Sequence, residues 1–166
     1  MVDHDRFSTG IVSQILRGFG LSNHIIIGTG KEAKKLLAGG RFHLLISESL
    51  LPDMKLADLV RWIRRHTDTK IRYMPVVVLT GYTQFSRVAH ARDAGVSSVV
   101  RKPVSPTTLF DHVLYAARTE RPFIDADDFA GPDRRFRPHD AAAGLNRRTS
   151  DHAADDLSLP PSPAAP

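Results

Sequence analysis

Six polar side chains stand where apolar runs of the sequence end, and Glu48 is the most informative of them. They are Asp3, His4 and Asp5 near the start, Glu48 after 43–47, Thr80 after 75–79, and Lys102 after 98–101. A strand that ends in an acid and continues into a loop is a common active-site layout. Chemistry at this site would therefore depend on the Glu48 carboxylate.

The elements that must position these residues follow from a periodicity that alternates between strand-like and helix-like segments. The expected helices span residues 5–19, 31–37, 56–66, 83–94 and 106–118, and the expected strands span 25–27, 43–47, 75–80 and 98–101. This alternation predicts βαβ units and a parallel sheet that helices cover on both faces. Sites in such sheets lie beyond the carboxyl ends of the strands, where the six residues stand.

Composition narrows the class of protein. The chain has 166 residues and no cysteine, which excludes disulfides, thiolate zinc sites and a thiol nucleophile. It has neither a long apolar run nor a secretory signal, so we expect a cytoplasmic protein with no membrane contact. Residues 1–120 contain 17 Lys and Arg against 10 Asp and Glu, which suits an acidic or phosphorylated partner or simply a solvated basic surface.

Residues 121–166 differ from the rest of the chain. They contain six Arg, eight Asp, no Lys, seven Pro and few large apolar residues. Such a segment cannot bury enough surface to offset its ordering entropy. We therefore expect a folded domain over residues 1–120 and a mostly disordered tail over 121–166.

Three segments resemble the receiver domain of bacterial two-component response regulators, the CheY-like fold. They are Leu51-Pro52-Asp53-Met54, Pro75-Val76-Val77-Val78-Leu79-Thr80-Gly81 and Arg101-Lys102-Pro103. The resemblance covers about residues 2–118 and implies a doubly wound α/β fold with a five-stranded parallel sheet in the order 2-1-3-4-5. Because only Met1 and Val2 precede Asp3, either the first strand is truncated or the true start lies upstream, and we expect the latter.

The resemblance implies phosphoryl transfer from a phosphohistidine to an acid at the end of the third strand. Glu48 stands at this acceptor position, where Asp is usual, and Thr80 and Lys102 match the residues that bind the phosphoryl oxygens. The Lys102–Pro103 bond resembles the cis peptide of the family. Asp3 and His4 stand where two acids hold Mg²⁺ together with a backbone carbonyl, here that of Leu50. Mg²⁺ prefers hard oxygen ligands, so His4 leaves at most a weak site.

Three departures from the family pattern favour a pseudo-receiver. Glu48 places its carboxylate about one bond further out, and ~1 Å of misplacement can cost ~100-fold in rate. His4 replaces an acid, and Val99 replaces an aromatic residue that acts as a switch in many receivers. Glu48 then either imitates a phosphoryl group by reaching Lys102 and Thr80, or only pairs with Lys102.

His4 supports a further hypothesis about pH. Two neighbouring carboxylates, those of Asp3 and Glu48, would raise the pKa of its imidazole, so that its positive charge would replace that of the metal. The alternative is an exposed histidine without a role.

We expect a stand-alone, non-enzymatic receiver that acts in phosphorelay signal transduction through protein–protein contacts. Its partner would be a histidine kinase, a phosphotransferase or an effector that binds the face formed by the fourth helix, fifth strand and fifth helix. No helix-turn-helix pattern follows residue 120, so direct DNA binding is not expected.

Two alternatives remain open. The first is a competent phosphoacceptor that uses Glu48 with Mg²⁺. The second is a receptor for a cyclic dinucleotide or another phosphate ligand, since a Gly-x-Asx-Arg-Arg pattern occurs twice in the tail. Its paired guanidinium groups, which suit phosphate oxygens, belong to Arg134, Arg135, Arg147 and Arg148.

Overall fold

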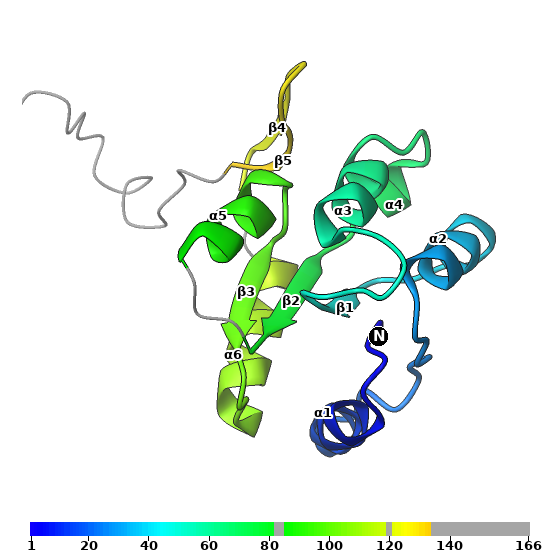
Figure 1. Ribbon diagram of the computed structural model, residues 1–166, viewed down its shortest axis with the longest axis vertical. Coiled ribbons are helices and arrows are strands. Elements are labelled where there is room, and N and C mark those ends of the chain that lie inside the picture. Colours follow the sequence, from blue (N-terminus) through cyan, green and yellow to red (C-terminus); the bar gives the residue numbers. More distant parts are fainter. Residues whose placement is uncertain (82–84, 119–120, 134–166) are drawn as a thin grey trace, which may run out of the picture. The chain divides into compact units, whose positions relative to one another are not determined.

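Three parallel strands form the central sheet of the computed structural model, which describes residues 1–81, 85–118 and 121–133. In spatial order they are β1 (Leu45–Glu48), β2 (Val76–Thr80) and β3 (Ser98–Arg101). The helices of this part of the chain are α1 (Arg6–Gly18), α2 (Gly30–Gly39), α3 (Leu56–Arg64), α4 (Thr69–Arg72), α5 (Phe85–Asp93) and α6 (Pro106–Arg118), as Figure 1 shows. The predicted α/β class is confirmed, although α4 was not anticipated.

The first two predicted strands are each reduced to a single bridging residue. Val2 forms one parallel bridge to Ile27 and another to Ser47 of β1. Its amide donates to Ile46 O at 2.9 Å, and its carbonyl accepts from Glu48 N at 2.8 Å. These bridges continue the order 2-1-3-4-5 beyond the three-stranded sheet. The run Ile25–Ile27 does not form a strand because so few residues lie beside it to accept and donate backbone hydrogen bonds.

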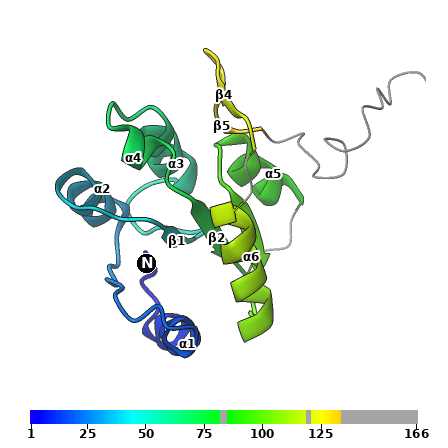
Figure 2. The same cartoon turned by 180° about the vertical axis from the view of Figure 1, so that it is seen from behind.

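Side chains alternate across the strands, so each face of the sheet has its own hydrophobic core. The core against α2, α3 and α5 includes Leu45, Val76, Val78, Ala33, Leu37, Leu59, Val60, Ile63, Ala91 and Ala94. The core against α1 and α6 includes Ile46, Val77, Leu79, Val100, Val12, Leu16 and Leu109. Figures 1 and 2 show α5 and α6 on opposite sides of the strands. Among the described helices, none is long and apolar enough to cross a membrane.

A β-hairpin follows α6. Its antiparallel strands are β4 (Phe123–Asp125) and β5 (Ala130–Pro132). The expectation of disorder from residue 121 onward therefore needs correction for 121–133, while residues 134–166 lie outside the described part of the chain.

Contacts with arginines and an aromatic ring explain why the hairpin is ordered. Arg65 donates to the carbonyls of Ala126 and Asp127, and Arg72 pairs with Asp125. The rings of Tyr73 and Phe123 meet edge to face with centroids 4.6 Å apart. Composition could not predict these contacts, because they join residues fifty or more positions apart.

Candidate functional site

Four of the predicted site residues meet at the carboxyl edge of the sheet. Glu48 ends β1, Thr80 ends β2, and Lys102 directly follows β3. The parallel register places Glu48 opposite Leu79 and Thr80 opposite Arg101. Asp3 joins them because it follows Val2, which bridges to β1.

Lys102 connects the two carboxylates of this site. Its Nζ donates to Asp3 Oδ2 at 3.0 Å and to Glu48 Oε2. The side chains of Asp3 and Glu48 are 3% and 11% exposed, and that of Lys102 is 23% exposed. The three groups therefore form a largely buried ion-pair network with one excess negative charge.

The network shifts the pKa values of Lys102 and Asp3 in opposite directions. Burial acts to lower the pKa of Lys102, but hydrogen bonds and charges from Glu48 and Asp3 outweigh it, so this pKa is raised. Burial acts to raise the pKa of Asp3, but the amide of Asp5, Lys102 and the Ser8 hydroxyl together lower it. Both shifts favour the charged forms at neutral pH.

Ser49 engages the second oxygen of the Glu48 carboxylate. Its amide and hydroxyl donate to Glu48 Oε1 at 2.6 and 2.7 Å. Its Oγ also lies 3.0 Å from Thr80 Oγ1, so it connects Glu48 to the predicted hydroxyl residue. Sequence reasoning missed Ser49, and its one available signal was a hydroxyl immediately after the strand-end acid.

The other predicted site residues are placed differently. His4 is exposed, and in the described structure it makes no hydrogen bond or ion pair with Asp3 or Glu48. The hypothesis that His4 lies beside these two carboxylates and responds to pH stays a prediction, and the cation that contacts both of them in the structure is Lys102. Val99 is half-buried in β3 and packs on the core beside α3. The Lys102–Pro103 bond is cis.

Mg²⁺ fits these residues poorly. The Asp3 carboxylate accepts from Asp5 N and Lys102, and the Glu48 carboxylate accepts from Lys102 and Ser49. A hard divalent ion needs several free oxygen ligands, whereas an ammonium already contacts both acids. Within the described residues, no group of three or more Asp, Glu, His or Cys side chains is placed to hold a metal ion.

The loop after β1 contains the segment Leu51–Met54, and this segment anchors the loop to the start of α2. Asp53 accepts from Gly30 N at 2.8 Å and from Lys31 N at 2.9 Å, so it caps the start of α2. A Cβ on Gly30 would lie 2.6 Å from Met54 Sδ, so a larger residue there would require the Met54 side chain to move. Leu50, 42% exposed, pairs with Lys55 across the same loop.

The tail candidates Arg134, Arg135, Arg147 and Arg148 lie outside the described residues. The structure therefore does not test these arginines as an anion site, and the second-messenger alternative stays a prediction from sequence.

Comparisons with known proteins agree with this geometry. The family described as response regulator receiver domain matches residues 1–114. The chain is 30% identical over 111 residues to the chemotaxis protein CheY of Pseudomonas aeruginosa, a match that covers 66% of this chain and 88% of that protein. It is 31% identical over 107 residues to the chemotaxis protein CheY-3 of Vibrio cholerae, which covers 63% and 81% of the two chains.

A solved structure supports the same fold. The signal receiver domain of a signal transduction histidine kinase from Syntrophus aciditrophicus superposes with a TM-score of 0.63 at 26% identity. The match covers 75% of this chain and 96% of that chain.

Proposed function

Because this chain belongs to the response regulator receiver domain family of two-component signalling, we propose that it is a receiver that signals without being phosphorylated. The observation that carries the proposal is the engagement of both Glu48 carboxylate oxygens. Lys102 takes one of them and Ser49 takes the other.

These contacts disfavour transfer to Glu48 in two ways. A nucleophilic oxygen must approach the phosphorus along a defined line, and here the hydrogen bonds of Lys102 and Ser49 hold the carboxylate. The ammonium that would stabilise charge on a phosphoryl group is already paired with Glu48 and Asp3.

The same contacts support Glu48 as an internal substitute for a phosphoryl group. Its carboxylate reaches Lys102 directly and reaches Thr80 through the Ser49 hydroxyl. A constitutive arrangement of these residues would present one state of the domain to its partner. That partner would be a signalling protein.

The face formed by α5, β3 and α6 is the proposed contact surface for that partner. His90, Arg101 and Tyr115 are exposed on it, and Val104 is half-buried. The cationic side chain of Arg101 and the aromatic ring of Tyr115 on this face suit an acidic amphipathic helix of a kinase, phosphotransferase or effector.

Incubation with a small phosphodonor and Mg²⁺, followed by intact mass measurement, tests the proposal. We expect the wild-type protein to gain no phosphoryl group. The double variant Glu48→Asp/His4→Asp restores the acids of the family pattern, and we expect it to gain one group because the shorter acceptor no longer reaches Lys102 in the same way.

A phosphoryl adduct on the wild-type protein that Glu48→Gln abolishes would overturn the proposal and support the phosphoacceptor alternative. An adduct that persists in Glu48→Gln would show modification elsewhere. The mass of a tryptic peptide that contains residue 48 distinguishes these two outcomes.

A further inference from the structure

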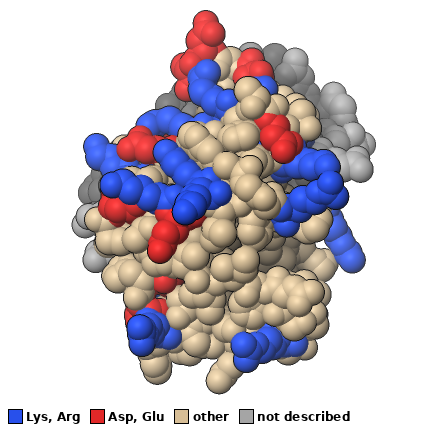
Figure 3. All heavy atoms as spheres, turned by 90° about the vertical axis from the view of Figure 1, so that its right-hand side faces the viewer, with Lys and Arg blue, Asp and Glu red and all other residues tan. Residues whose placement is uncertain are grey.

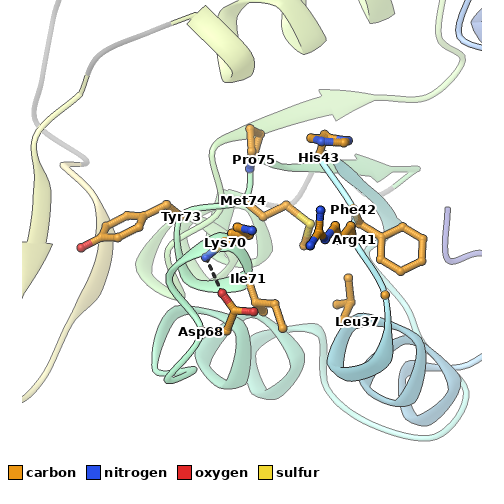
Figure 4. Close-up of a pocket in the computed structure, with 11 residues that line it drawn as sticks. Leu37, Arg41, Phe42, His43, Asp68, Lys70, Ile71, Tyr73, Met74 and Pro75 are labelled. Atoms are coloured by element: carbon orange, nitrogen blue, oxygen red, sulfur yellow. Dashed lines mark hydrogen bonds between the residues drawn. The ribbon is translucent and has the colours of Figure 1, made fainter.

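A cavity of about 600 Å³ lies at the amino-terminal ends of β1 and β2, on the edge of the sheet opposite Glu48. We call it the basal cavity. Its floor is apolar, because Leu37, Ile71 and Met74 are at most 6% exposed. Figure 4 shows these side chains between α2 and the segment that contains α4, with Tyr73 pointing away from them. The volume falls within the range typical of small-molecule sites.

The walls of the basal cavity are held by specific contacts. Arg64 donates to the carbonyls of Arg72 and Met74, both at 2.8 Å, which fixes the backbone behind the floor. A Cβ on Gly40 would lie 2.6 Å from the Phe42 ring, so glycine allows that ring to fold against the cavity. The cavity is therefore formed before any ligand binds.

The rim of the basal cavity is cationic. Its cations are Arg41 and Lys70, and His43 lies beside them. All three are exposed, and among the described residues their side chains make no hydrogen bond or ion pair. The acid on the rim is Asp68, and one of its oxygens accepts from Lys70 N at 2.8 Å as the cap of α4. The positive charges of the rim thus exceed its negative charge.

The surrounding surface adds to this potential. Figure 3 shows many Lys and Arg side chains, interspersed with acids, on the face that lies to the right in Figure 1, where α2 is. Three of the cations on α2 are Lys31, Lys34 and Lys35. Summed positive charge around an apolar opening raises the local concentration of small anions.

We propose that the basal cavity binds a small anion with an apolar or aromatic body, such as an aryl carboxylate. The floor of Leu37, Ile71 and Met74 would bury the body, and Arg41 and Lys70 would pair with the anionic group. A neutral aromatic molecule would lose the ion pairs, and inorganic phosphate would lose the burial. This site is separate from the ion-pair network at the carboxyl edge and does not depend on the proposed function.

Titration of the full chain with 2-naphthoate, followed by two-dimensional ¹H–¹⁵N NMR, tests the proposal. We expect saturable shifts at Leu37, Ile71 and Met74.

In Arg41→Glu/Lys70→Glu we expect binding to weaken about tenfold, because two attractive charges become repulsive. The matched control Arg6→Glu/Arg17→Glu reverses two charges at exposed residues of α1 that do not line the cavity, and its affinity should change less than about twofold.

Results of four kinds would overturn the proposal, and the first three concern 2-naphthoate itself. These are no saturable binding, shifts that map away from the cavity, and equal weakening in both charge-reversal variants. Binding of 2-naphthalenemethanol or inorganic phosphate as tight as that of 2-naphthoate would also overturn it, because the site would then not require both chemical features. The dispersion of the same spectra shows whether each variant is folded.

Discussion

Lys102 at the carboxyl edge of the sheet and Arg64 near its amino edge are both enclosed cations, but they are neutralised differently. Lys102 contacts two carboxylates, those of Asp3 and Glu48. Arg64 is 1% exposed and donates to the carbonyls of Gly95, Arg72 and Met74 and to Ser97 Oγ. One edge pairs charge with charge, whereas the other surrounds charge with neutral acceptors.

Because of this difference, the contacts around Lys102 change with pH, whereas those around Arg64 are structural. The pKa of Asp3 beside Lys102 is lowered, so acid removes the contribution of this carboxylate to the network. The carbonyls around Arg64 do not titrate. Burial, and then the charge of Arg121, lowers the pKa of Arg64 to about 10, so the guanidinium remains charged at neutral pH. The contrast teaches that the carboxyl edge carries an ion-pair network that responds to pH, whereas neutral contacts at the amino edge hold the backbone behind the basal cavity in place.

Arg64→Met should produce the largest effect. It leaves four buried hydrogen-bond acceptors without their donor, and we expect a loss of about 3–4 kcal/mol in the free energy of unfolding. Urea denaturation measures this loss. Arg61→Met on the same helix is the matched control, because Arg61 is 63% exposed and its one ion pair among the described residues is with Asp58, so its loss should stay within about 0.5 kcal/mol. Equal losses would remove the contrast between a buried cation and a surface one.

Lys102→Met should have the next largest effect and should depend on pH. It leaves Asp3 and Glu48 together without their cation, and we expect a loss of about 2–3 kcal/mol at neutral pH. Arg101→Met, an exposed neighbour, is the control and should change stability little.

The sign of the pH dependence follows from the two pKa shifts. The Lys102 pKa is raised, so its contribution is present below 10.5 and is lost as pH rises through the folded value. The Asp3 pKa is lowered, so its contribution is present above 3.8 and is lost as pH falls through the folded value. The difference between wild type and Lys102→Met should therefore shrink in urea denaturation below pH 3.8. A difference that is constant with pH would contradict the titrating network.

Gly95→Ala should lower the free energy of unfolding by a smaller amount, and its effect should include the hairpin. Gly95 has φ +98°, and a Cβ there would lie 2.5 Å from Ala130 O. We expect a loss of about 2 kcal/mol and faster amide exchange at 123–132. Gly20→Ala is the control, because Gly20 has φ +79° with no atom near the added Cβ, so only a strain of about 1 kcal/mol applies. Unchanged exchange in the hairpin would show that it does not depend on this close approach.

The sequence predicted the site at the carboxyl edge better than the contacts within it. Glu48, Thr80 and Lys102 end consecutive strands, and parallel strands must bring such ends together. The contact between Lys102 and Glu48 was predicted. The second contact of the same ammonium, with Asp3, was not, because the resemblance suggested a metal beside that acid. Spacing along the chain also did not predict that Lys102, and not the exposed His4, would contact both acids.

Local pattern alone determined the α/β class. It also determined the helices that begin at Leu56 and Pro106 and the strands 76–80 and 98–101. The reason is that apolar periodicity indicates which face of an element is buried. Tertiary structure alone decided that Ile25–Ile27 forms no strand, because this run has too few backbone partners. It also decided that residues 123–132 form a hairpin, which depends on arginines far away in the sequence. Tertiary structure also decided that Ser49 and Lys102 divide the Glu48 carboxylate between them. Such contacts depend on where distant side chains meet in space, and no local pattern of residues encodes that.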